Sequence, residues 1–230
     1  MQLTIRKIDF PLILINLKTY QQSTGSKAIE LALIAEDVSR NTGVCIAVSP
    51  QTIDLRPVIH ATSIPVFAQH IDPIEYGKNT GHNLPNAFVN AGCTGTLISH
   101  SERRLDLNSI DDTVKRAQEV KLFQVVCVDT IERGESVASY HPDSIAIEPP
   151  ELIGTGIPVS KAQPGIIEGA VKSVKKVDSN VKVLCGAGIT SGEDVSAALD
   201  LGAEGILVAS GVVKAADPRI KILELARAML

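Results

Sequence analysis

The sequence predicts an α/β fold in which eight strand–helix units close into a (β/α)8 barrel. Short apolar runs rich in Val and Ile alternate with longer segments of helical periodicity along the whole 230-residue chain. No linker, composition shift or low-complexity tract divides the chain. Because barrels of this kind commonly occupy roughly 200–250 residues, we expect residues 1–230 to form a single domain.

The eight predicted strands are short, and most are apolar on consecutive residues, as is typical of parallel strands buried on both faces. They are residues 11–15, 44–48, 65–68, 95–98, 122–128, 143–147, 181–184 and 205–208.

Helices are predicted most clearly after the first, fourth, sixth, seventh and eighth strands. Residues 27–38 carry a broad apolar stripe, and the later segments open with capping residues or a first-turn proline. Those residues are Asn108 or Ser109, Pro164, the Thr190–Glu193 pair and Asp217–Pro218. An open, doubly wound sheet is the alternative, but no GxGxxG follows the first strand and no GxxxxGK[ST] occurs.

Composition argues against several classes of function. The net charge is −4 and no Lys/Arg cluster is longer than a pair, which disfavours a nucleic-acid surface. No apolar run reaches the roughly 18 residues of a membrane span, and the first residues do not resemble a signal peptide. Cys45, Cys127 and Cys185 lie in apolar runs without metal-ligand spacing, which predicts buried thiols in a reducing cytoplasm.

The segment 146–156, AIEPPELIGTG, is the most informative part of the chain. An apolar run ends at Glu148, Pro149 and Pro150 force a turn, and Gly154 and Gly156 offer unshielded amides. This arrangement suits a base at a strand tip followed by a loop that closes over an anion. Taken alone, however, a segment of this kind is more often a surface acid before an ordinary turn.

Other polar residues also fall at predicted strand tips, where parallel barrels build their sites. Asn16 and Lys18 end the first strand and His100 ends the fourth, while Gly/Ala/Ser turns follow the last two. Each is commonplace by itself, since a lone Lys or His is usually a surface residue. Their convergence on one face indicates a substrate that combines a phosphate with a carbon acid.

Three motifs in order give the chain a resemblance to the triosephosphate isomerase family, in its shorter archaeal form. INLKT at 15–19 resembles the family's N-x-K signature, and ISHSERR at 98–104 is similar to its GHSERR, with Ser99 in place of Gly. AIEPPELIGTG at 146–156 resembles the lid YEPVWAIGTG. The resemblance covers essentially the whole chain and implies a TIM barrel.

The resemblance also implies roles for five residues in the interconversion of dihydroxyacetone phosphate and D-glyceraldehyde 3-phosphate. Glu148 shuttles the proton through an enediolate, and a neutral His100, at a helix start beginning with Ser101, polarises the carbonyl. Lys18 supplies positive charge, Asn16 donates to the oxyanion, and Glu102 positions Lys18. No metal and no organic cofactor is implied.

Substrate binding is expected to use backbone amides and a closing loop, Pro149 to Val159, that excludes water. The phosphate amides implied are those of Gly154, Ala187, Gly188, Ala209 and Ser210, and the lid contains Pro149, Pro150, Glu151, Ile153, Thr155 and Gly156. Glu151 replaces the usual Trp of the lid, and Ala209–Ser210 replaces the usual Gly-Gly.

The loop after the third strand, 69–85, corresponds to one that reaches a neighbouring subunit in the family. We therefore expect a homo-oligomer, which is at least a dimer and could be a tetramer. We expect no nucleic-acid or membrane partners. Two other readings stay open: another phosphate-binding barrel enzyme, and a catalytically silent barrel retained for binding or assembly.

Overall fold

The computed structural model describes residues 6–149 and 164–230. Its eight parallel strands lie in the order β2-β1-β8-β7-β6-β5-β4-β3, and a bridge between Val48 and Val66 joins the two ends. The sheet therefore closes, and the predicted (β/α)8 TIM barrel is confirmed. The strands are β1 (Leu12–Asn16), β2 (Cys45–Ser49), β3 (Phe67–Ala68), β4 (Gly95–Ile98), β5 (Phe123–Val128), β6 (Ser144–Ile147), β7 (Lys182–Cys185) and β8 (Gly205–Val208).

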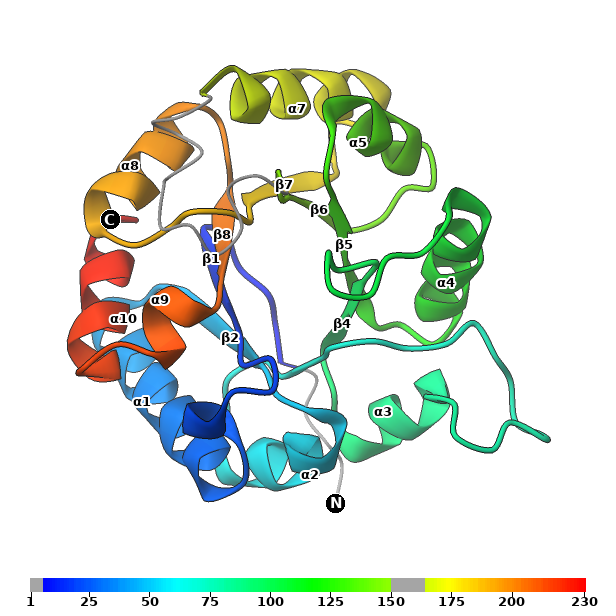
Figure 1. The fold of residues 1–230 in the computed structure, drawn as a ribbon, viewed down its shortest axis with the longest axis horizontal. Helices are drawn as coiled ribbons and strands as arrows, with labels where there is room; N and C mark the ends of the chain where they lie inside the picture. Colours follow the sequence, from blue (N-terminus) through cyan, green and yellow to red (C-terminus); the bar gives the residue numbers. More distant parts are fainter. Residues whose placement is uncertain (1–5, 150–163) are drawn as a thin grey trace.

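Helices surround the strands in chain order, as Figure 1 shows. The helices after the second, third and fifth strands, which the sequence left unclear, are α2, α3 and α5. The described helices are η1 (Gln21–Ser23), α1 (Ser26–Thr42), α2 (Thr52–Ala61), α3 (Pro85–Ala91), α4 (Leu107–Glu119), α5 (Ile131–Ala138), α7 (Pro164–Val177), α8 (Gly192–Asp200), α9 (Ser210–Val213) and α10 (Pro218–Arg227).

Two of the predicted helix caps were wrong by a few residues. The cap of α4 is Asp106, whose carboxylate accepts the amide of Ser109 at 2.9 Å. The capping box of α8 pairs Ser191 with Asp194, one residue later than predicted. Both shifts have one cause: a chain can offer several capping residues in a row, and only the turn before the helix selects one. The predicted Asp217 cap of α10 is confirmed.

The core has two layers. Inside the barrel, inward-facing side chains from all eight strands fill the axis, including Leu12, Leu14, Phe67, Leu97 and Leu184. Outside it, strand residues of the opposite parity pack against the inner faces of the helices. Two-sided burial explains why the strands read as continuous apolar runs.

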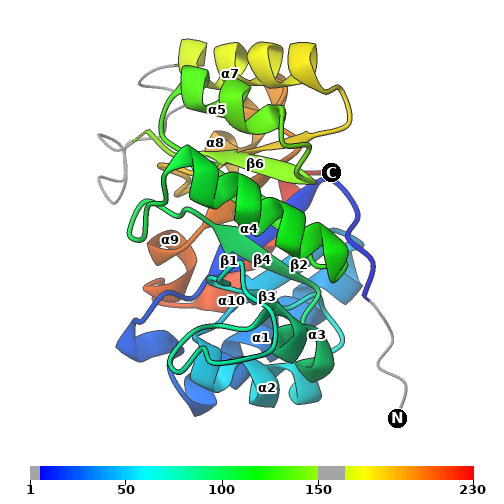
Figure 2. The same ribbon diagram turned by 90° about the vertical axis from the view of Figure 1, so that its right-hand side faces the viewer.

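The described loops that follow the strands lie at one end of the barrel, and the first described residues lie at the other (Figure 2). Cys93, Cys127 and Cys185 are buried free thiols, as predicted for the last two, but Cys45 is only partly buried. Burial raises the pKa of Cys93 and Cys185 to about 12, so both stay protonated. Over the described ranges, no helix is long and apolar enough to cross a membrane.

Close packing between β1 and β8 generates a stability prediction at Gly205. A Cβ added there would lie 2.3 Å from the carbonyl oxygen of Leu12, a backbone atom that cannot move without disturbing the ladder. We expect Gly205→Ala to lower the free energy of unfolding by about 3 kcal/mol, measured by urea denaturation.

The matched control is Gly165→Ala at the start of α7, where an added Cβ meets nothing within 4 Å. This variant should be unchanged or slightly more stable, because alanine restricts the unfolded chain. Equal losses from both substitutions would contradict the role assigned to the β1–β8 contact.

Candidate active site

The end of β1 delivers Asn16 and Lys18 to the mouth of the barrel. The buried Asn16 side chain accepts the amide of Lys18 at 3.0 Å through its Oδ1 atom. The chain is not extended through these residues, because Lys18 has a left-handed backbone with φ of 49°. The turn itself, fixed by the Asn16 side chain, brings both residues to one cavity.

Gln69, at the end of β3, secures this turn and was missed by the sequence analysis as a site residue. Its side-chain nitrogen donates to the carbonyl oxygens of Lys18 and Ser49, both at 3.0 Å, and lies 3.4 Å from Oδ1 of Asn16. One amide group therefore ties the ends of β1, β2 and β3 together. No local pattern marks such a residue, because its partners are distant in sequence.

His100 follows β4 and is buried. Its Nδ1 atom accepts the backbone N–H of Glu102 at 3.2 Å, which leaves the proton of the neutral ring on Nε2. Burial, aided by the positive charge of Lys18, lowers the pKa of His100 to about 4. The helix start expected at Ser101 was wrong: residues 101–103 form a turn, and α4 begins only at Leu107.

Glu148 ends β6 and is 4% exposed. Its Oε1 atom lies 3.5 Å from Nε2 of His100, so the protonated ring nitrogen faces the carboxylate. Burial raises the pKa of Glu148 to about 7, against the lowering effects of the Cys127 thiol and the charge of Lys18. Among the described residues, its Oε2 atom has no hydrogen-bond partner.

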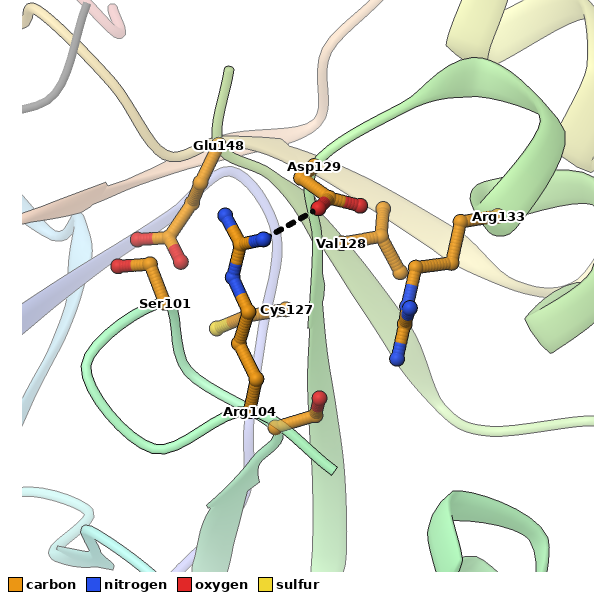
Figure 3. Close-up of a pocket in the computed structure, with 8 residues that line it drawn as sticks. Ser101, Arg104, Cys127, Val128, Asp129, Arg133 and Glu148 are labelled. Atoms are coloured by element: carbon orange, nitrogen blue, oxygen red, sulfur yellow. Dashed lines mark ion pairs between the residues drawn. The ribbon is translucent and has the colours of Figure 1, made fainter. Parts of the chain in front are cut away.

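Figure 3 shows the surroundings of this carboxylate, which points toward Ser101 while the guanidinium of Arg104 lies between Glu148 and Asp129. Arg104 pairs with Asp129 at 2.9 Å, and the Cys127 side chain lies beneath. The space enclosed here is only about 10 Å³, roughly one water molecule, so it cannot hold a substrate.

Glu148 also lines a second cavity, whose volume of about 400 Å³ is large enough for a small substrate. It brings together all five residues expected to be catalytic, with the ammonium of Lys18 paired to Glu102 at 2.9 Å. The turns after β7 and β8 also line it, and their predicted phosphate-binding residues are Ala187, Gly188, Ala209 and Ser210.

Part of the predicted binding apparatus falls outside the described residues. This part comprises Gly154 and the lid residues Pro150, Glu151, Ile153, Thr155 and Gly156. Pro149 is described and is buried next to Glu148.

Gly186 is a second positioning residue that the sequence analysis did not assign to the site. A Cβ at this position would lie 2.5 Å from Cγ of Glu148 and 3.0 Å from the carbonyl oxygen of Ile147. Only glycine lets β7 pass this close to the carboxylate. In the described ranges, no group of three or more His, Cys, Asp or Glu side chains is placed to hold a metal ion.

Comparison with known proteins identifies the family. The family model described as triosephosphate isomerase matches residues 11–229. The triosephosphate isomerase of Methanocaldococcus jannaschii is 54% identical over 93% of this chain and 98% of its own length. Those of Methanothermobacter thermautotrophicus and Methanosarcina acetivorans are each 50% identical over 94% of this chain, covering 95% and 98% of their own lengths. The chain therefore belongs to the triosephosphate isomerase family, whose members are aldose–ketose isomerases.

Proposed function

We propose that this chain interconverts dihydroxyacetone phosphate and D-glyceraldehyde 3-phosphate by proton transfer through an enediolate. The observation that carries the proposal is the pairing of Glu148 with a neutral His100 across 3.5 Å, at the edge of a cavity that also holds Lys18. A base, an uncharged proton donor and a fixed cation are what an enediolate intermediate requires. The membership of the chain in a family of isomerases supports the same reaction.

In this mechanism, Glu148 removes a proton from one carbon and returns it to the neighbouring carbon. A pKa of about 7 suits both steps, since the group is ionised often enough to accept the proton and acidic enough to return it. Burial supplies that pKa, because the carboxylate loses hydration that its neighbours replace only in part.

His100 would donate the Nε2 hydrogen bond to the substrate oxygen as negative charge develops on it. A neutral imidazole is suited to this role because the pKa of its N–H group is close to the pKa of the enediol. The pKa of an imidazolium ion is much lower than either. Lys18 and Asn16 would stabilise the same charge from the β1 side of the cavity. Glu102 would hold the Lys18 ammonium in place through the 2.9 Å ion pair.

We assign the substrate phosphate to the backbone amides of Ala187, Gly188, Ala209 and Ser210, together with Gly154 of the lid. The small side chains of the two described turns support this assignment, because they leave the amides accessible. The proposal also includes closure of the loop from Pro149 to Val159 over the substrate. It further assigns the chain a place in glycolysis or gluconeogenesis, as a cytoplasmic homo-oligomer.

The direct test is a coupled assay of glyceraldehyde 3-phosphate isomerisation by the purified chain, with EDTA present and no metal added. We expect robust turnover, and inhibition by 2-phosphoglycolate, which mimics the enediolate. Folded protein that neither turns over this substrate nor binds the inhibitor would refute the proposal. Thermal-shift screening of other phosphorylated sugars would then identify the ligand that the barrel accepts.

The role of Glu148 gives a prediction that separates catalysis from folding. Glu148→Gln keeps the shape of the side chain but cannot accept a proton, so we expect kcat to fall by about 10³-fold or more. A folded-state pKa above the ordinary value means that ionisation destabilises the native protein as the pH rises from about 4.5 to 7. At pH 8 the variant should therefore be at least as stable as the wild type in thermal denaturation. Wild-type turnover, or a large loss of stability, would contradict the assignment.

The two shifted pKa values predict the pH dependence. Because Glu148 must be ionised to act as a base, kcat/KM should fall about tenfold per pH unit below pH 7. His100 should stay neutral, with its proton on Nε2, down to about pH 5. ¹³C NMR of labelled glutamate and ¹⁵N NMR of labelled histidine would assign the two titrations independently of the ionisation of the substrate phosphate. A Glu148 pKa near 4.5, or a His100 pKa near 6.5, would contradict this account.

A further inference from the structure

Tyr20 forms part of the wall of the substrate cavity and has no role in the chemistry proposed above. Among the described residues that line the cavity, only Tyr20 and His100 carry aromatic rings. The ring of Tyr20 is partly buried and packs against the main hydrophobic cluster. The position of this ring therefore affects the size of substrate that the cavity can accept, and so do the contacts that fix the ring.

The backbone holds Tyr20 firmly. Its carbonyl oxygen accepts the amide of Ser23 at 3.0 Å and the hydroxyl groups of Ser23 and Thr24 at 3.3 and 2.8 Å. These three donors come from η1 and the residue after it, so the loop that follows Lys18 is closed on itself. A side chain on such a loop can serve as a fixed wall.

The ring is held by Lys214. The ammonium nitrogen of Lys214 lies 4.4 Å from the centroid of the Tyr20 ring, within the range of a cation–π interaction. Lys214 itself does not line the cavity, so it contacts the ring from outside. Its backbone amide donates to Ser210 at 3.0 Å, which connects it to the turn assigned to the phosphate. The pair thus links the loop after β1 to the loop after β8, two paired strands (Figure 1).

The order of strands shows which end of the substrate this wall would meet. In the closed ring β8 lies four strands from β4, so the turn containing Ser210 faces His100 across the barrel. A substrate polarised by His100 and held through its phosphate at the β8 turn spans the barrel mouth. The wall behind the phosphate then sets how far that group can lie from the reacting carbons.

We propose that Tyr20 is a specificity-determining residue that limits the site to three-carbon phosphate esters, and that Lys214 is the residue that positions it. This inference rests on the proposed function, since it assigns the phosphate to the β8 side of the cavity. A longer ester whose carbonyl reached His100 would push its phosphate toward the Tyr20 ring. The ring is held by its backbone turn and by Lys214, so it cannot retreat without losing these contacts.

The test compares two ligands that differ in length, 2-phosphoglycolate and 4-phospho-D-erythronate. Calorimetry measures the Kd of each for the wild type and for variants, and the ratio of the two Kd values reports length selection. We expect Tyr20→Ala to reduce the preference for the short ligand by about tenfold or more, the usual value of a lost packing contact in a specificity pocket. Tyr20→Phe keeps the ring and the cation–π contact, and should retain the wild-type ratio.

Substitution of Lys214, whose side chain is exposed, provides a second and independent test of the proposal. Lys214→Met should reduce the preference by a smaller factor, raising KM for the triose phosphate more than it lowers kcat, and Lys214→Arg should restore both. An unchanged ratio in Tyr20→Ala and in Lys214→Met would overturn the proposal, as would an equal effect of Tyr20→Phe. The failure of the proposed function looks different: the wild type would then show no triose phosphate turnover and no preference for the short ligand.

Discussion

The burial of one carboxylate organises the functional end of this barrel. Glu148 ends β6 with 4% of its surface exposed, and burial raises its pKa to about 7. The neighbouring strand accommodates the side chain only because Gly186 has no Cβ to meet it. Since a buried ionised group without full compensation destabilises a fold, the site must be held in place by interactions elsewhere. Closure of the barrel and its two-layered core provide them.

Barrel closure also explains how residues far apart in the chain converge. Parallel strands end at the same rim, so Asn16, His100 and Glu148 line one cavity although they lie at the ends of β1, β4 and β6 or just beyond them. The same geometry allows long-range supports such as Gln69, which binds carbonyls from two other strands. The rim is thus a network in which each strand end is fixed by its neighbours.

The sequence alone predicted the eight strands, the residues at their tips and the family, because apolar runs and strand-end polar residues are local signals. It could not predict Gln69, Gly186 or Tyr20 as site residues, since their importance lies in contacts made by folding. The capping residues of α4 and α8 were displaced for a related reason: several candidates stood in a row, and tertiary structure selected among them.

The neutrality of His100 shows how the expected outcome can have a different cause. A helix dipole at Ser101 was expected to keep the ring uncharged, yet no helix starts there. Burial and the nearby Lys18 lower the pKa instead, and the amide of Glu102 fixes the tautomer. Burial thus raises the pKa of Glu148 and lowers the pKa of His100, because it disfavours the charged form of each group. The acid becomes a base that can return its proton, and the imidazole becomes a donor that carries no charge; one desolvated rim provides both.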